Sequence, residues 1–473
     1  MSNENDSKSR KERTMEALAN VVEVVNGFVW GPVLLILLVG TGIFLTIRLG
    51  FIQISQLPYA LKLAFSRQQD KSSEGDVSHF QALMTALSAT VGTGNIAGVA
   101  TAVVLGGPGA LFWMWFAALF GMATKYGEAI LAVKYRITNE FGQKSGGPMY
   151  YIERGLGWKW LAVLFAVFGT VAAIFGIGNM VQSNSVAEAL NKSLGINPWL
   201  TGFVLAVLTG LVILGGIKSI ARVTSVLVPF MTVFYIFGGL IIVLMNISLV
   251  PEAFSLIFRE AFTAESVGGG VLGTAVRFGI ARGLFSNESG LGSAPIAAAA
   301  AKTDHSGRQA LVSMTGTFID TFVVCTFTGL ALVMSGIYIG ADPNADSASL
   351  TVQAFDGFLP VFGNIVVTGG LILFAYSTVL GWSYYGEKCF TYLFSDRSLY
   401  VYRAIFVVFT FIGAGLSVDL IWGIADIFNG LMAFPNLIAL LLLSGVIVEE
   451  TKKFQDIRRQ EVAKPLSRDV GSQ

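Results

Sequence analysis

The chain has 473 residues and a formal net charge of +1, and 54% of its residues are hydrophobic while only 13% are charged. An ordinary soluble chain carries roughly 25% charged residues, so this composition excludes a soluble multidomain protein. Neither the near-neutral balance nor any basic patch indicates a nucleic-acid partner, and we predict an all-α integral membrane protein whose surroundings are the lipid bilayer.

The first expected elements are a charged N-terminal tail at 1–27 and an extra membrane helix at 28–47. This apolar run matches the ~20 residues of a span and is too long for a signal-peptide core. Residues 80–124 carry no charge, and the turn Gly106-Gly107-Pro108-Gly109 divides them into two spans. Eight more spans are expected at 161–187, 199–217, 223–249, 268–301, 310–339, 358–386, 404–418 and 420–448.

Lysine and arginine residues orient these eleven spans, because loops on the cytoplasmic side carry the excess. Most of them follow the odd-numbered spans or lie in the tail at 449–473. We therefore expect a multi-pass protein of the plasma membrane, monomeric, with its N-terminus outside and its C-terminus in the cytoplasm.

Two spans are interrupted near their middles by glycine and polar residues. The second contains the stretch 92–98 (GTGNIAG), and the seventh contains 283–292 (GLFSNESGLG). Glycine costs ~1 kcal/mol relative to alanine inside a helix, so such clusters favour unwinding. Unwound backbone at membrane depth is tolerated only where protein or a water-filled cavity receives it.

The interruptions hold matching places if the chain divides into five-helix repeats at 80–250 and 268–448. An odd number of helices inverts the second repeat, and paired broken helices in inverted repeats are typical of secondary transporters. Close helix packing through small residues is the alternative. A channel would lack the matched breaks. An enzyme is not expected, because His79 and His305 lie at span edges and the cysteines Cys325 and Cys389 form no motif.

Several motifs resemble those of the alanine or glycine:cation symporter family. They are 86–98 (ALSATVGTGNIAG), 106–109, 113–115 (WMW), 146–150 (GGPMY), 176–182 (GIGNMVQ), 283–301 and 374–382 (FAYSTVLGW). The resemblance extends from about Trp30 to Glu450. It implies a LeuT-like fold of five plus five inverted helices with one extra N-terminal helix. It also implies sodium-coupled uptake of alanine or glycine by alternating access, with sodium as the transported ion and no cofactor.

The first break offers groups for an amino acid. Unpaired NH groups at the start of a half-helix attract a carboxylate, and here they belong to Thr93, Gly94 and Asn95. By the resemblance, Gln182 contacts the substrate; its alternative role is a hydrogen bond between helices. We expect Trp382 and Phe278 to close the pocket around a small side chain.

The carbonyl end of the same break suits a cation. Sodium prefers oxygen ligands, and the carbonyls near Ser88 and Val91 lose their helical partners. By the resemblance, the ninth span faces this point and adds the hydroxyls of Ser377 and Thr378. Hydroxyls bonded back to their own helix are the alternative.

Ionisable residues inside the spans are functional or structural candidates. Arg282 and Glu288 flank the second break and are expected to pair, while Asp426 is expected to join helices and Arg277 has no assigned role. A proton-coupled mechanism, with Glu288 or Asp320 as the carrier, is the main alternative to sodium coupling.

Overall fold

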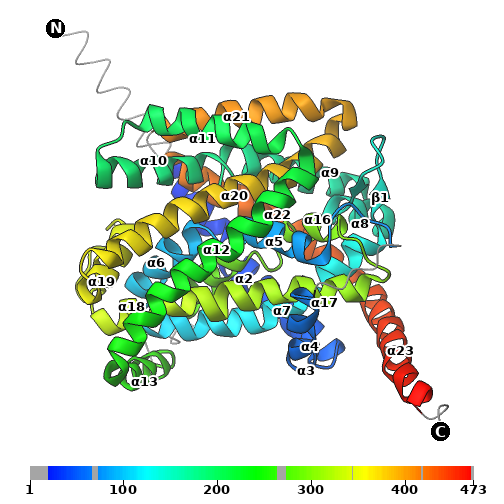
Figure 1. The fold of residues 1–473 in the computed structure, drawn as a ribbon, viewed down its shortest axis with the longest axis horizontal. Coiled ribbons are helices and arrows are strands. Elements are labelled where there is room, and N and C mark those ends of the chain that lie inside the picture. The colour runs from blue at the N-terminus through cyan, green and yellow to red at the C-terminus, as the bar shows by residue number, and fades with distance from the viewer. Residues whose placement is uncertain (1–19, 67–72, 264–272, 344, 417–418, 470–473) are drawn as a thin grey trace.

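The computed structural model describes residues 20–66, 73–263, 273–343, 345–416 and 419–469, and within them the chain is almost entirely helical (Figure 1). Residues 1–19 of the expected tail and 268–272 of the seventh expected span lie outside the described residues. The first membrane helix runs from Asn20 to Arg48 and so starts before residue 28. Valines on both sides of Glu23 extend its apolar sequence.

The first half of the chain supplies two interrupted spans and several continuous helices. Its elements are α2 (Pro32–Arg48), α3 (Ile52–Ser55), α4 (Leu57–Ala64), α5 (His79–Thr90), η1 (Thr93–Asn95), α6 (Ala97–Gly106), α7 (Gly109–Lys134), α8 (Pro148–Tyr151), η2 (Ile152–Leu156), α9 (Lys159–Phe175), α10 (Met180–Leu194), α11 (Pro198–Ile213), α12 (Gly216–Met245), η3 (Ile247–Leu249) and α13 (Val250–Glu260).

The second half begins with another interrupted span. Its elements are α15 (Thr274–Asn287), α16 (Ala294–Ala299), α17 (Ser306–Thr317), η5 (Phe318–Cys325), α18 (Thr326–Ser335), α19 (Ser347–Phe358), α20 (Phe362–Phe394), η6 (Asp396–Ser398), α21 (Leu399–Gly415), α22 (Asp419–Leu442) and α23 (Ser444–Asp469).

Helix length and composition confirm the all-α membrane architecture. Among the described residues, eight helices are long and apolar enough to span a membrane, and α5 with α6, bent by 63°, makes a ninth. Helix α11 has only 16 residues, and the halves α15 and α16 are separated by a break. The number eleven and the limits of the two repeats therefore stay predictions.

The long helices form one bundle whose two ends differ. Helices α11 and α21 lie side by side along one edge, and α7 packs with α17 along the other, with α20 between them (Figure 1). Helices α13 and α19 lie at one end of the bundle, whereas α8, α16 and the short strands lie at the opposite end, from which α23 projects.

A strap of backbone hydrogen bonds joins the two broken helices at the α16 end. Val77, before α5, and Ala301, after α16, form a parallel β-bridge. Arg136 donates to the carbonyl oxygens of Ala299 (3.1 Å) and Ala301 (2.7 Å) and to that of Glu74 (2.9 Å). The neighbouring hairpin pairs β1 (Ile137–Thr138) with β2 (Lys144–Ser145). These contacts tie the segments before α5 and after α16 together at this end of the bundle.

Candidate functional site

The first broken span starts in a capping box and unwinds before Gly92. Ser78 Oγ accepts from the Gln81 amide (3.1 Å), and Gln81 Oε1 accepts from the Ser78 amide (3.0 Å), which fixes the start of α5. Val91 (ψ 94°) and Gly92 (φ −145°) are extended. The last carbonyls of α5 therefore lose helical partners, as the glycine-rich sequence predicted.

Side chains from two other helices converge on Gly92. A Cβ atom there would lie 2.6 Å from Thr378 Oγ1 of α20 and 3.8 Å from Gln182 Oε1 of α10. Gln182 Nε2 donates to Thr93 Oγ1 (3.2 Å) and to the Ile177 carbonyl (3.0 Å). The bond to Thr93 is the hydrogen bond between spans that we expected as the alternative role of Gln182. Gln182 Oε1 is buried and accepts no hydrogen bond from the residues that the structure describes. One acceptor is thus available beside the break.

The hydroxyls of α20 face the carbonyl end of the same break. Ser377 Oγ donates to the Phe374 carbonyl (2.8 Å) and also lies 3.2 Å from the Ser88 carbonyl oxygen. Thr378 Oγ1 donates to the Phe374 carbonyl (3.0 Å). Both hydroxyls therefore bond back to their own helix, and Ser377 reaches α5 as well. One hydroxyl that we assigned to sodium, that of Ser377, thus lies within 3.2 Å of an assigned carbonyl oxygen, that of Ser88.

The second break passes through three left-handed residues, Glu288 (φ 55°), Gly290 (φ 90°) and Gly292 (φ 83°). Glycine adopts this conformation at little cost, whereas Glu288 needs interactions to hold it there. Its carboxylate accepts from Trp382 Nε1 of α20 (2.9 Å) and from Ser293 Oγ across the break (2.5 Å). Trp382 is thereby tied to the second break.

A buried carboxylate links the two breaks. Asp320, in the π-helical segment η5, accepts from Asn95 Nδ2 (2.7 Å), Ser286 Oγ (3.0 Å) and Thr321 Oγ1 (2.9 Å). Asn95 Oδ1 in turn accepts from the Gly92 amide (2.8 Å). The backbone NH of Asn95 donates to the Gly92 carbonyl (3.2 Å), so this NH group is not the free donor that the sequence predicted. Asn95 instead shapes the break.

One sequence prediction about charged neighbours is wrong, and Phe278 is not among the residues that line the cavity. Arg282 does not pair with Glu288: its nearest acidic partner is Asp426, with Nη1 and Oδ2 separated by 3.9 Å. The left-handed turn at Glu288 directs that carboxylate toward Trp382 instead. Phe278 lies under the Arg277 guanidinium, 5.6 Å from its ring centroid, and Phe285 takes the place expected for it beside the cavity.

Helix α7 contributes buried charges that the sequence did not assign. Lys125 and Glu128 were expected to lie beyond the end of the third span, but α7 continues to Lys134 and both are buried. Glu128 Oε1 accepts from the Gly292 amide (3.2 Å) and from Asn436 Nδ2 (2.6 Å). Lys125 interacts electrostatically with Glu288, Glu128 and, more weakly, Asp320. The sequence signal for these buried charges was their position, because Lys125 and Glu128 follow the uncharged run 80–124.

A third break divides the fourth span, which was expected to be continuous. Helix α9 ends at Phe175 and α10 begins at Met180, with Gly176 and Gly178 between them. A Cβ atom on Gly178 would lie 2.6 Å from Trp382 Cβ, so this glycine allows α20 to approach. The paired glycines were a signal of the same kind as those in the other two breaks.

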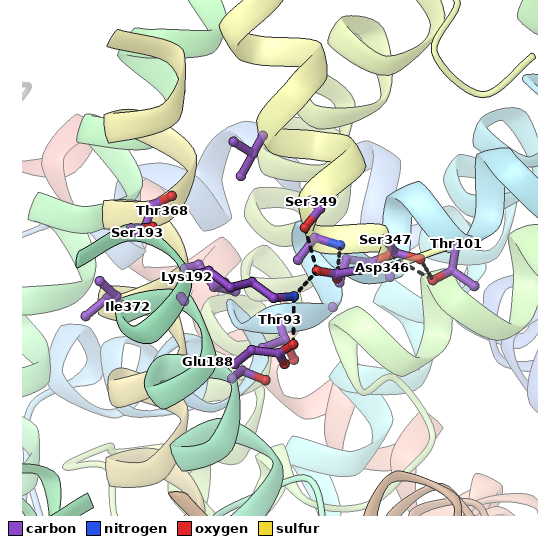
Figure 2. Close-up of a pocket in the computed structure, with 18 of the residues that line it drawn as sticks. Thr93, Thr101, Glu188, Lys192, Ser193, Asp346, Ser347, Ser349, Thr368 and Ile372 are labelled. Atoms are coloured by element: carbon purple, nitrogen blue, oxygen red, sulfur yellow. Dashed lines mark hydrogen bonds and ion pairs between the residues drawn. The ribbon is translucent and has the colours of Figure 1, made fainter. Parts of the chain in front are cut away.

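A cavity of 960 Å³ leads to the first break from the α19 end of the bundle. Its lining includes Thr93, Gly94 and Phe285, so it reaches two of the predicted substrate residues. Near its mouth, Lys192 Nζ lies 2.7 Å from Glu188 Oε1 and 2.9 Å from Asp346 Oδ2 (Figure 2). The cavity thus gives the first break an approach from this side of the bundle.

Comparisons with known proteins agree with this arrangement. The family described as the sodium:alanine symporter family matches residues 15–468. The sodium/alanine symporter AgcS of Methanococcus maripaludis is 62% identical over 93% of this chain and 98% of its own. The putative sodium/proton-dependent alanine carrier protein YrbD of Bacillus subtilis is 38% identical over 94% of each chain.

The fold has a counterpart among solved structures. The crystal structure of MhsT in complex with L-phenylalanine superposes with a TM-score of 0.58 at 15% identity, covering 80% of this chain and 98% of that one. This similarity confirms the LeuT-like fold. The family match over nearly the whole sequence and the 62% identity to the relative from Methanococcus maripaludis lead to one conclusion: the chain belongs to the sodium:alanine symporter family.

Proposed function

We propose that the protein is a sodium-coupled symporter that imports small neutral amino acids, alanine and glycine, by alternating access. The observation that carries the proposal is the convergence of Thr378 and Gln182 on the unwound backbone at Gly92, where Gln182 Oε1 has no partner within the described part of the chain. The name of the Methanococcus maripaludis relative, a sodium/alanine symporter, supports the choice of ion and substrate.

The amino acid is placed by its two charged ends. Its carboxylate approaches the backbone at Thr93 and Gly94, because the start of a half-helix is partially positive. Its ammonium group donates to Gln182 Oε1, which has no partner among the described residues. Trp382, one turn beyond Thr378 on the same face of α20, then closes the space around the substrate side chain. Phe285, which lines the cavity, is the second aromatic ring in this proposal.

Sodium lies at the other end of the break. Its ligands in this proposal are the carbonyl oxygens of Ser88 and Val91 and the hydroxyl oxygens of Ser377 and Thr378. Hydroxyls that now donate to the Phe374 carbonyl keep lone pairs for a cation. A hard ion that has lost its water suits this all-oxygen set.

The cavity gives the direction of access. The excess of lysine and arginine in the loops after odd-numbered spans supports an external position for the α19 end of the bundle. The cavity then opens outward while the strap from Val77 to Ala301 closes the cytoplasmic end. A bundle that is open at one end and tied together at the other is typical of a carrier that works by alternating access, whereas a channel opens to both sides at once.

Uptake of labelled alanine into proteoliposomes tests the proposal. We expect a sodium gradient to drive accumulation, and we expect replacement of sodium by choline to abolish it. Counterflow of labelled alanine should occur, as it does for a carrier and not for a channel. Undiminished uptake in choline under a pH gradient would overturn sodium coupling and would favour Asp320 or Glu288 as a proton carrier.

Removal of the Thr378 hydroxyl should weaken sodium binding. In Thr378→Ala we expect the sodium concentration for half-maximal uptake to rise about tenfold, as for the loss of one ligand to a charged group. Thr391→Ala is the matched control, because Thr391 also bonds back to α20, at the Lys388 carbonyl, but lies away from the breaks. Unchanged sodium dependence in Thr378→Ala would remove Thr378 from the site.

A further inference from the structure

Trp382 lies where the broken helices meet, and its position is fixed from several sides. Its Cβ packs on Gly178 in the third break, and its ring meets Tyr385 edge-on at 5.6 Å. Its indole nitrogen donates to Glu288 Oε1 at 2.9 Å. Trp382 and Glu288 are 1% and 3% exposed, so water does not compete for this bond.

Glu288 is itself held by its surroundings. Its second carboxylate oxygen accepts from Ser293 Oγ, the residue before α16, so the side chain bridges the break that it occupies. Lys125 is the largest favourable electrostatic partner of Glu288. A left-handed, non-glycine residue is retained here at a conformational cost, which the hydrogen bonds to Trp382 and Ser293 offset.

We propose that Glu288 is a positioning residue that fixes the indole of Trp382 and thereby sets the largest side chain the transporter accepts. The inference rests on the proposed function, in which Trp382, one turn beyond Thr378 on α20, closes the substrate pocket. The buried hydrogen bond to the carboxyl group of Glu288 restrains rotation of the indole about its side-chain torsions. Without the acceptor the ring gains alternative rotamers, and the space next to the substrate enlarges.

Substitutions at both ends of the bond separate positioning from bulk. Glu288→Ala removes the acceptor and leaves the bulk of Trp382 unchanged, whereas Trp382→Phe removes the donor together with part of the bulk. Glu288→Gln keeps an acceptor oxygen, and Ser293 can supply either half of a hydrogen bond to the new amide. Glu128 and Asp320 remain as partners of Lys125 in each Glu288 variant.

The measurement is competition of glycine, alanine, 2-aminobutyrate and valine against labelled alanine, a series that changes size without adding polar groups. We expect Glu288→Ala and Trp382→Phe each to improve competition by 2-aminobutyrate and valine, relative to alanine, by about tenfold, the effect of one hydrogen bond to a charged group. The double variant should match either single variant, and Glu288→Gln should keep the wild-type ratio. Trp115→Phe, which loses an indole bond to Thr326, is the matched control and should also keep it.

The outcomes distinguish this inference from the proposed function. If Trp382→Ala widens the accepted range while folded Glu288→Ala and Trp382→Phe do not, the pocket wall stands and the role of Glu288 is overturned. If Trp382→Ala also leaves the range unchanged, Trp382 is not the wall and both fail. Should Glu288→Ala not fold, Glu288→Met takes its place, because it removes the acceptor oxygens but keeps the length of the side chain and leaves Trp382 unchanged; an unchanged range in that variant overturns the role of Glu288.

Discussion

Asp320→Ala should reduce sodium-driven alanine uptake by about a hundredfold. The substitution deprives Asn95, Ser286 and Thr321 of their shared acceptor inside the protein. Each buried polar group left unpaired costs ~1–3 kcal/mol, and each ~1.4 kcal/mol is a factor of ten in an equilibrium. Because Asn95 also caps the Gly92 amide, the damage reaches the backbone of the first break, where we place the substrate carboxylate.

Asp320→Asn is the matched control. Its carbonyl oxygen can accept from Asn95, and the hydroxyls of Ser286 and Thr321 can turn to accept from its NH₂ group. We expect this variant to keep at least about a tenth of wild-type uptake, since only a net hydrogen-bond difference remains. Uptake should be measured with the amount of folded protein in the membrane. If folded Asp320→Asn is as inactive as Asp320→Ala, the charge itself is required, and the proton-carrier alternative gains over the structural role.

The sequence predicted two of the three breaks, those before α6 and after α15, because their cause is local. Gly92, Gly94 and Gly98 weaken one helix, and Gly290 with Gly292 allow the left-handed turns of the other. Hydropathy likewise predicted α12 and α20, because the hydrocarbon thickness sets the length of a span, but the predicted ends lie four to eight residues from those in the structure. The gathering of Ser377 and Thr378 near the first break came from the family resemblance and not from spacing alone.

The missed features depend on contacts between distant segments. Nothing near Asp320 in the sequence indicates that Asn95 and Ser286 will donate to it, since the pairing exists only once η5 lies between the breaks. Arg282 and Glu288 are near in sequence, yet the left-handed conformation at Glu288 sends its side chain elsewhere. A lysine is expected at the end of a membrane span because a charged side chain is not tolerated next to lipid. Lys125 lies inside α7 instead, since this part of the helix packs against protein.

Gly381→Ala should have an effect of similar size on sodium dependence, through the packing of α20 on α5. A Cβ atom at residue 381 would lie 2.6 Å from Ser88 Oγ and 2.7 Å from the Ala89 backbone nitrogen. The hydroxyl can rotate, but the backbone of α5 cannot yield without separating the two helices. Separation moves the Ser88 carbonyl away from Ser377 Oγ, which now lies 3.2 Å from it. Those are two of the oxygens in the proposed sodium site.

Overpacking of this kind costs ~1–3 kcal/mol, so we expect the sodium concentration for half-maximal uptake to rise by about ten- to a hundredfold. Gly40→Ala in α2 is the matched control, because a Cβ atom there meets nothing within 4 Å, and alanine also favours the helix. The alanine concentration for half-maximal uptake at saturating sodium should change less than the sodium requirement, since Gly381 contacts the cation end of the break. Wild-type sodium dependence in folded Gly381→Ala would show that the contact between α5 and α20 does not set the distance between the sodium ligands, and the site would then have to be placed elsewhere along the break.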